Sequence, residues 1–386
     1  MKILLSDYLF DGERLLKDKA VVVDNGVVVD IDGFKIIKKA YPEVKIEEFS
    51  GGVLFPGFVN THVHLELGYL KGKTVRSKGF VEWLKSIMGS KLEDEDVIKD
   101  SIKNGIDELL KSGVGLVGDI SNTLLSVEYL DKYMPQSVVF YENYSLNKKK
   151  ACSVVEKLKK ERLTAKSVRV SVVLHAVYST HPCLAEFICS LNHTPFTVHL
   201  LESRFENQFL RNSGKLFDFL EGIGFVSDRF YFDDVWDFLK NTSCLKRNAI
   251  FVHCVEATDR DIEKIKELKG TVCLCLRSND FISSKLPDVY KICASGVNVA
   301  FGTDSLASND NLNFLEELRF AHKAFPLIEA EKIFKWAISG GAKALNTKWG
   351  FFKSHSCRPF FIPSSIYSPL IYILEEKGED PLIINA

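Results

Sequence analysis

The chain has 386 residues and a net charge of −1, with acidic and basic residues spread evenly along it. This length suits one large domain plus a small one, and the even charge argues against a nucleic-acid partner. No stretch of about 18 uncharged apolar residues occurs, so we expect no membrane span. The first seven residues turn polar too early for a signal peptide, which favours a cytoplasmic location.

The two ends of the chain predict a small β domain. Residues 19–30 contain two Val-rich runs separated by Asn25-Gly26, a strong signal for a β-hairpin, and residues 44–49 suggest another strand. Near the other end, residues 362–374 have the composition of a strand or turn element that would complete this layer. We therefore expect a small β-sandwich-like domain built from residues 1–52 and 345–386.

Residues 53–344 predict an α/β fold, a (β/α)8 TIM-like barrel, because eight short β-rich runs alternate with helical periodicity. The runs are residues 53–60, 114–120, 136–143, 167–175, 196–202, 249–255, 271–276 and 297–304. The candidate helices between them are residues 96–112, 153–162, 183–192, 258–268, 288–295 and 312–325. Two long gaps, residues 61–95 and 203–248, leave the C-terminal face of the barrel, where insertions shape substrate pockets.

The nine cysteines show no C-x-x-C spacing. In a chain this long we expect small apolar core residues in a reducing compartment, and we expect no disulfide framework. Cys273 and Cys275, two residues apart, would share one face of a strand.

Metal-ligand side chains stand at the ends of several predicted strands. These residues are His62, His64, His199, His253 and Asp304. The C-terminal ends of parallel barrel strands gather catalytic side chains, and the i, i+2 spacing of His62 and His64 puts both on one face. Several imidazoles with one carboxylate suit zinc or ferrous iron. His175, not Lys, ends the fourth strand, so a bridging carbamate is not expected and one divalent ion, Zn²⁺ or Fe²⁺, is preferred.

Glu202 follows His199 by three residues and could lie beside the metal without binding it. A metal lowers the pKa of a bound water toward about 7, and a base such as Glu202 can take the proton. Glu202 could instead be a helix N-terminal carboxylate, and Asp304 could be a helix cap rather than a ligand. His253 could be a ligand or a donor to the water, and His175 a substrate contact or a rim histidine.

These residues together resemble the amidohydrolase superfamily, from Pro56-Gly57-Phe58 to Gly302-Thr303-Asp304. Within it, the chain is similar to the mononuclear branch that deaminates cytosine, guanine and adenosine-type compounds, which pairs an H-x-H with H-x-x-E, a third His and a late Asp. The resemblance implies that the metal ligands are His62, His64, His199 and Asp304. It also implies that Glu202 is the proton-transfer group and that His253 stabilises the water or the tetrahedral intermediate.

The resemblance extends to substrate contacts. The family's Cys-Pro-x-Ser-Asn loop is here Cys275-Leu276-Arg277-Ser278-Asn279, in which Leu replaces Pro but Ser278 and Asn279 remain for substrate contact. In the first long loop, Glu66 is suited to ribose hydroxyls and Trp83 to stacking on a base. The alternatives are a solvated charge for Glu66 and a core aromatic for Trp83.

The chain resembles the aminodeoxyfutalosine deaminase subfamily of the futalosine route to menaquinone. The stretches that carry this likeness are residues 62–66, 80–87 and 304–309. The resemblance implies a small-molecule nucleoside substrate and allows a homodimer. The alternatives are S-adenosylhomocysteine, methylthioadenosine, adenosine, guanine or cytosine as the substrate, and a non-catalytic metal-binding protein. Arg277, Arg204 and Lys148 are candidates for binding a carboxylate at the far end of the substrate.

Overall fold

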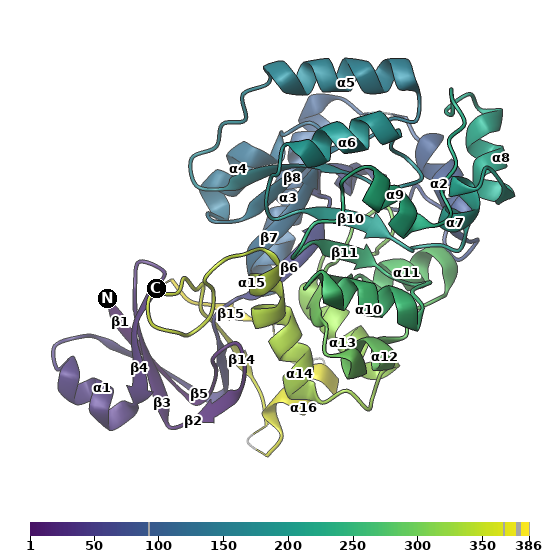
Figure 1. Cartoon of the computed structure of the whole chain (residues 1–386). Helices are drawn as coiled ribbons and strands as arrows, with labels where there is room; N and C mark the ends of the chain where they lie inside the picture. Colours follow the sequence, from purple (N-terminus) through teal and green to yellow (C-terminus); the bar gives the residue numbers. More distant parts are fainter. Residues whose placement is uncertain (92, 366, 376–379, 386) are drawn as a thin grey trace.

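The computed structural model describes residues 1–386 except 92, 366, 376–379 and 386. It is an α/β protein in which a sheet made from both chain ends lies beside a larger body of parallel strands and helices (Figure 1). Among the described residues, no helix is both long enough and apolar enough to cross a membrane.

The first sheet has the order β15-β14-β5-β1-β3-β4, with β2 paired to β1. Its strands are β1 (Lys2–Phe10), β2 (Leu15–Lys17), β3 (Lys19–Asp24), β4 (Val27–Gly33), β5 (Ile46–Phe55), β14 (Phe360–Pro363) and β15 (Leu382–Ile383). The predicted hairpin is confirmed: β3 and β4 pair antiparallel around Asn25 and Gly26, which both have positive φ. Helix α1 (Phe34–Ala40) packs on this hairpin.

The C-terminal element differs from its prediction. β14 pairs antiparallel with β5 and so joins the N-terminal layer as expected, but residues 369–374 are helical, within α16 (Pro369–Glu375). A proline fits the first turn of a helix, and Leu370, Ile373 and Leu374 bury one helical face. Ile366, within the predicted segment, lies outside the described residues.

Eight parallel strands form two four-stranded sheets in chain order. They are β6 (Phe58–Val63), β7 (Val114–Ser121), β8 (Val138–Asn143) and β9 (Arg169–Leu174), then β10 (Thr197–Leu200), β11 (Ile250–His253), β12 (Thr271–Leu274) and β13 (Asn298–Phe301). Isolated parallel bridges between Ala176 and His199 and between Val63 and Asp304 join the two sheets at both edges. The segment after β13 is thus bridged to the end of β6.

Residues 53–60, predicted as one strand, belong to two different strands. β5 ends at Phe55 in the first sheet, and β6 begins at Phe58 in the second, with Pro56-Gly57 between them. Gly57 has φ of +104°, and a Cβ on it would lie 2.9 Å from the Trp349 ring. A side chain is therefore excluded where the chain passes from one sheet to the next.

The helices follow the predicted alternation. Those at predicted positions are α3 (Glu95–Lys111), α5 (Lys148–Lys160), α6 (Pro182–Ser190), α10 (Asp259–Glu267), α12 (Val289–Ser295) and α13 (Phe314–Ala324). The two long gaps contain η1 (Leu65–Leu70) and α2 (Phe80–Met88), then α7 (Phe205–Leu210), α8 (Gly214–Gly222) and α9 (Val235–Asn241). The other helical segments are α4 (Ser126–Tyr133), α11 (Leu276–Ser283), α14 (Ala330–Lys335), η2 (Trp336–Gly340) and α15 (Gly341–Ala344).

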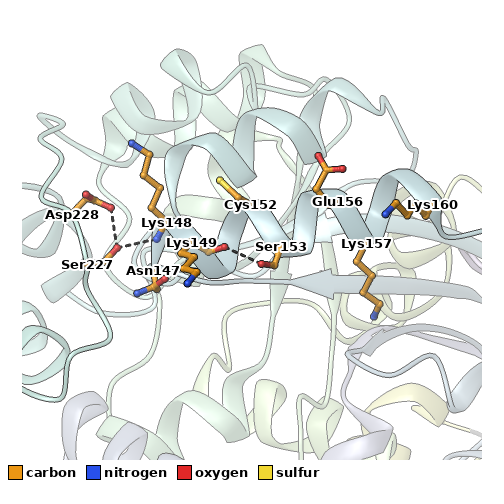
Figure 2. A pocket seen from close by; sticks show the side chains of 10 residues that line it. All are labelled: Asn147, Lys148, Lys149, Cys152, Ser153, Glu156, Lys157, Lys160, Ser227 and Asp228. Atoms are coloured by element: carbon orange, nitrogen blue, oxygen red, sulfur yellow. Dashed lines mark hydrogen bonds between the residues drawn. The ribbon is translucent and has the colours of Figure 1, made fainter.

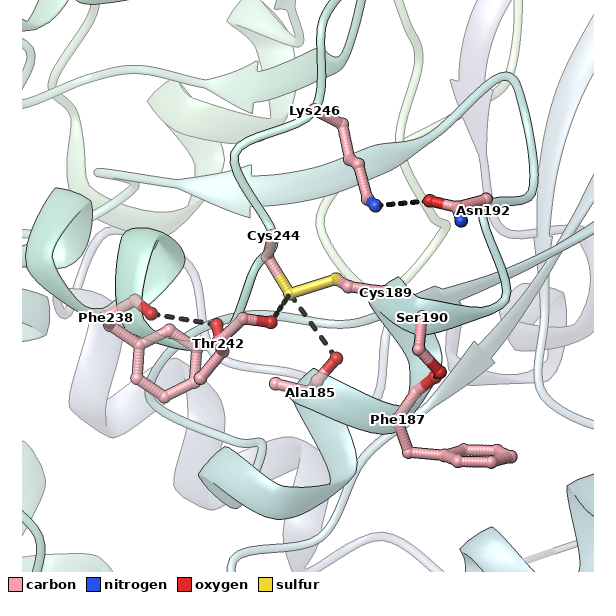
Figure 3. Close-up of a disulfide and its surroundings, with 9 residues drawn as sticks. All are labelled: Ala185, Phe187, Cys189, Ser190, Asn192, Phe238, Thr242, Cys244 and Lys246. Atoms are coloured by element: carbon pink, nitrogen blue, oxygen red, sulfur yellow. Dashed lines mark hydrogen bonds between the residues drawn. A yellow bond between two sulfur atoms is a disulfide. The ribbon is translucent and has the colours of Figure 1, made fainter.

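Two of the cysteines form a disulfide, whereas the sequence predicted small core residues with free thiols. Cys189, in α6, forms a disulfide with Cys244, which follows α9 (Figure 3). The two residues are 55 positions apart, and their spacing gave no signal, because only the packing of the outer layer brings them together. Cys273 and Cys275 are buried free thiols.

An aromatic cluster joins the first sheet to the parallel strands. The Phe360 ring stacks on Phe55 at 5.2 Å between centroids and meets Phe58 edge-on at 4.8 Å. Phe55, Phe58 and Phe360 are fully buried. Aromatic pairs of this kind add to the free energy gained by burying the rings.

We expect Phe360→Ala to lower the free energy of unfolding by about 3–5 kcal/mol, because the change leaves a cavity between the sheets. Chemical denaturation followed by circular dichroism measures this loss. Leu327→Ala is the control, since Leu327 is 82% exposed and its loss should change stability by less than about 0.5 kcal/mol. Equal effects of the two changes would contradict the proposed role of the cluster.

Candidate metal and catalytic site

The ends of four parallel strands bring the predicted reactive residues together. His62 lies in β6 and His64 directly follows it, His199 lies in β10, and His253 ends β11. Asp304 follows β13 and bridges back to β6, where its N–H donates to the His62 carbonyl at 3.1 Å. His253 and Asp304 have positive φ, a strained conformation for residues with a side chain that recurs at functional sites.

The imidazole and carboxylate atoms converge on one region. The Nε2 atoms of His62 and His64 lie 3.2 Å apart, and Asp304 Oδ1 lies 3.7 Å and 3.5 Å from them. One ring nitrogen each of His62, His64 and His199 falls within 4.8 Å of the others. Neutral imidazoles beside one carboxylate form the donor set that zinc or ferrous iron takes, so the residues fit a divalent metal.

Burial keeps these histidines neutral. Desolvation lowers the pKa of His64 to about 4, holds the pKa of His62 well below its usual range, and lowers the pKa of His199. Neutral rings offer the lone pairs that a cation needs. Burial alone would raise the pKa of Asp304, but His64, His253 and the Ser278 hydroxyl hold it below its usual value.

Asp304 is fixed from both sides. Its Oδ2 accepts hydrogen bonds from the Ser278 hydroxyl at 2.6 Å and the Ser308 hydroxyl at 3.0 Å, and its Oδ1 accepts from the Ser305 N–H at 2.8 Å. Partners that orient a metal ligand commonly control the affinity for the metal. Ser278, which the sequence predicted to contact substrate, instead donates to Asp304 and does not line the cavity.

Glu202 lies beside His253, with its Oε1 3.5 Å from His253 Nε2. Among the described residues, this buried oxygen has no hydrogen-bond partner. Burial, followed by the charges of Asp304 and Glu206, raises the pKa of Glu202 well above its usual value. A carboxyl group in this environment can hold a proton near neutral pH, which suits transfer to and from a substrate.

Glu206 is a carboxylate in the first turn of a helix, the role that was the alternative prediction for Glu202. Its carboxylate accepts hydrogen bonds from the N–H groups of Leu201 at 2.8 Å and Glu202 at 2.7 Å, so it holds the turn before α7. Glu202 is thereby left free of a capping role. Glu206 was not among the residues predicted from the sequence, although it stands only four residues after Glu202.

Asn279 orients His253. Its amide nitrogen lies 3.0 Å from His253 Nδ1. This contact holds the imidazole ring with its Nε2 on the side of Glu202. Asn279, like Ser278, supports a reactive residue and does not line the cavity.

The reactive residues open into a cavity of about 240 Å³. One part of its wall is apolar and comes mainly from α2 and the α8 region; these residues are Leu67, Trp83, Leu84, Ile87, Met88, Leu220 and Phe225. The other part is polar; these residues are His64, Asn122, Glu142, Tyr144, His175, Tyr178, Ser179, His199, Glu202, His253, Asp304 and Ser305.

Trp83 and His175 line the cavity, where the sequence analysis expected substrate contacts. The Trp83 Nε1–H donates to the Ala307 carbonyl at 2.9 Å, which fixes the ring at the cavity wall. His175 Nδ1 lies 2.7 Å from the Ser179 hydroxyl. Their contacts with a substrate stay predictions.

Glu66 is buried outside the cavity lining. Its carboxylate accepts hydrogen bonds from the Ser121 hydroxyl, from the Asn122 N–H at 2.9 Å, and from the N–H and hydroxyl of Thr123 at 3.1 Å and 2.8 Å. Both carboxylate oxygens therefore anchor the loop after β7. The expected contact with ribose stays a prediction.

The three candidates for a distal carboxylate do not line this cavity. The Arg277 guanidinium donates to Asn311 Oδ1 at 2.8 Å, and the Arg204 guanidinium stacks over the Phe205 ring. Lys148 lines a separate surface hollow of about 910 Å³ along α5, close to Ser227 and Asp228 (Figure 2).

Glu142 is a cavity residue that the sequence analysis missed. It stands near the end of β8, is 5% exposed, and its Oε1 lies 3.8 Å from His199 Nδ1. Burial raises its pKa to about 8. Hydroxyl donors from a ligand and the charge of a nearby cation would both favour its ionised form. The available signal was an acidic residue inside an apolar strand.

We expect Ser278→Ala to weaken metal binding by about 10- to 100-fold, because Asp304 loses one of the hydroxyls that orient it. Metal content and competition with a chromogenic chelator measure this. Ser153→Ala on the surface of α5 is the control, since its hydroxyl donates to the Lys149 carbonyl of the same helix, far from Asp304 in the chain. Unchanged affinity in Ser278→Ala would refute the orienting role.

Comparisons with known proteins agree with this arrangement. A model of the Amidohydrolase family matches residues 53–353. Adenosine deaminase of Helicobacter pylori is 32% identical over 350 residues, covering 86% of this chain and 83% of that protein. A 5'-deoxyadenosine deaminase of Methanococcus maripaludis is 28% identical over 382 residues, covering 93% and 85%.

A solved structure resembles the whole chain. The crystal structure of Helicobacter pylori aminofutalosine deaminase in complex with methylthio-coformycin has a TM-score of 0.88 and 25% identity, covering 99% of this chain and 97% of that one. Fold neighbours of this kind imply a TIM barrel. With the family model matched over most of its length, the chain belongs to the amidohydrolase family, and it is a hydrolytic deaminase.

Proposed function

We propose that this deaminase removes the amino group of 6-amino-6-deoxyfutalosine, giving futalosine and ammonia in menaquinone biosynthesis. The observation that carries the reaction type is the unpartnered Glu202 oxygen beside Nε2 of His253, with both residues lining the cavity that His64, His199 and Asp304 also line. The likeness to aminofutalosine deaminase over nearly the whole chain supports the choice of substrate.

The proposed metal ligands are His62, His64, His199 and Asp304, holding one divalent ion, Zn²⁺ or Fe²⁺. Such an ion would supply Lewis-acid chemistry, which lowers the pKa of water so that it can add to the purine carbon near neutral pH. Glu202 takes a proton from the attacking water and delivers it to the purine ring nitrogen next to the reacting carbon. His253 Nε2–H donates a hydrogen bond to the oxygen that adds to this carbon, and Asp304 orients the same oxygen. Glu202 then carries the remaining proton of the added hydroxyl to the amino nitrogen, the carbon–nitrogen bond breaks as the carbon–oxygen double bond forms, and the amino group leaves as ammonia.

We further propose that residues 53–344 form a closed (β/α)8 barrel and that residues 1–52 and 345–386 form a separate β-sandwich-like domain. The bridges at both edges of the two parallel sheets support closure of the barrel. The mixed sheet of strands from both chain ends supports the small domain. A cytoplasmic location and a homodimer belong to the same proposal.

A second candidate is deamination of adenosine or 5'-deoxyadenosine, which the names of two relatives favour. S-adenosylhomocysteine, methylthioadenosine, guanine and cytosine remain alternatives in the same reaction class. The apolar part of the cavity wall favours a nucleoside over a bare base, because it offers area for a group beyond the reacting ring.

We expect Glu202→Gln to retain the metal and to lower the rate of ammonia release by at least about 10²- to 10⁴-fold, because the proton carrier is lost. Metal analysis together with a coupled ammonia assay measures both properties. Glu263→Gln, at an exposed position of α10, is the matched control and should keep full activity. Unchanged turnover in Glu202→Gln would remove this residue from the mechanism.

We expect 6-amino-6-deoxyfutalosine to give the highest kcat/KM in a panel that also contains S-adenosylhomocysteine, methylthioadenosine, adenosine, guanine and cytosine. Ammonia release by metal-loaded protein, with chelator-treated protein as the blank, measures it. A preference for another adenosine compound would keep the reaction and change the pathway. Metal binding without turnover of any amine would support the non-catalytic alternative.

A further inference from the structure

Four of the eight parallel strands supply the reactive residues, and the cavity extends beyond them. β6, β10, β11 and β13 carry or precede the histidines, Glu202 and Asp304. The remaining polar wall comes from the ends of β7, β8 and β9, where Asn122, Glu142 and His175 line the cavity. A polar part of the substrate that does not react can be bound over these strand ends.

Glu142 is held rigidly in this part of the wall. The Asn122 amide donates to Glu142 Oε2 at 3.1 Å and to the Glu142 carbonyl at 3.2 Å. Asn122 is itself held through its N–H by Glu66 Oε2 at 2.9 Å. The series Glu66–Asn122–Glu142 therefore fixes a carboxylate at the cavity wall before any ligand binds, as a preorganised binding site requires.

Glu142 is not the residue that orients the ring of His199, the proposed metal ligand. His199 Nδ1 lies 3.0 Å from the His175 carbonyl, so this carbonyl takes the ring proton and fixes the tautomer. Glu142 Oε1 is 3.8 Å from the same nitrogen, beyond hydrogen-bond distance. The Asn122 amide donates to Oε2, and within the part of the chain that the structure describes Oε1 accepts no hydrogen bond, which leaves it for another donor.

Oε1 of Glu142 is a hydrogen-bond acceptor to which no described residue donates, so a ligand that uses it must bring a donor. In an adenosine-type nucleoside, the donors apart from the amino group that leaves are the sugar hydroxyls. We infer that Glu142 binds the 2'- and 3'-hydroxyls of the substrate ribose and is a specificity-determining residue for ribonucleosides. This inference rests on the proposed function. It assigns to Glu142 the contact that the sequence analysis expected of Glu66, which instead positions Asn122.

The test compares adenosine with 2'-deoxyadenosine and 3'-deoxyadenosine in the wild-type enzyme and in Glu142→Gln. We expect the wild type to lose about 10- to 100-fold in kcat/KM when a contacted hydroxyl is removed, the size of a hydrogen bond to a charged group. Glu142→Gln should lose a similar factor on adenosine and discriminate less than about threefold between the sugars, with unchanged metal content. Glu128→Gln, at an exposed position of α4, is the matched control and should behave as wild type.

Each other outcome has a distinct meaning. Equal kcat/KM of the wild type for the three nucleosides would overturn the inference without any variant. Full discrimination in Glu142→Gln, or loss of metal in proportion to loss of activity, would overturn it in favour of a structural role beside His199. Calorimetric binding of inosine and 2'-deoxyinosine gives the same comparison without turnover. Ammonia release from no adenosine compound would overturn the proposed function itself, and the inference with it.

Discussion

The burial of several imidazoles and carboxylates in one small cavity is the constraint on which the rest of the structure depends. His62, His64, His199 and Asp304 are almost fully buried, and each would be costly to bury alone in its charged form. Desolvation lowers the pKa of the rings, while the adjacent histidines and the Ser278 hydroxyl hold the pKa of Asp304 below its usual value. This division of charge leaves lone pairs and one negative charge directed at the same place, which is the requirement of a divalent cation.

The surrounding chain holds this cluster with hydrogen bonds that come from distant parts of the sequence. The Asn60 amide donates to the Thr303 hydroxyl at 2.8 Å, and the Thr303 N–H donates back to Asn60 Oδ1 at 3.2 Å, which fastens β6 to the segment that carries Asp304. Glu206 fixes the turn that carries Glu202. Buried carboxylates thus serve in two ways, as reactive groups and as anchors for the backbone.

The division of the cavity into an apolar and a polar part follows from the origin of its walls. Helix α2 and the α8 region belong to the two long segments between strands, residues 61–95 and 203–248, and they contribute apolar side chains such as Trp83 and Leu220. The strand ends contribute the polar side chains, because charged groups at these positions can be fixed by neighbouring strands. The proposed reactive residues therefore lie at the ends of the parallel strands, and the apolar contact surface comes from the long segments 61–95 and 203–248. Enzymes built on parallel strands commonly divide these roles between strand ends and loops.

The sequence by itself determined the alternation of strands and helices, the hairpin at Asn25-Gly26, and the placement of the proposed metal ligands and Glu202 at strand ends. These features depend on local periodicity and on the one edge where parallel strands end, so they can be deduced without coordinates. Only the tertiary structure decided that Glu66 is an anchor, that Glu142 lines the cavity, and that Cys189 meets Cys244. Whether a side chain faces a cavity or a neighbouring loop depends on contacts between segments far apart in the chain, and local sequence patterns do not record those contacts.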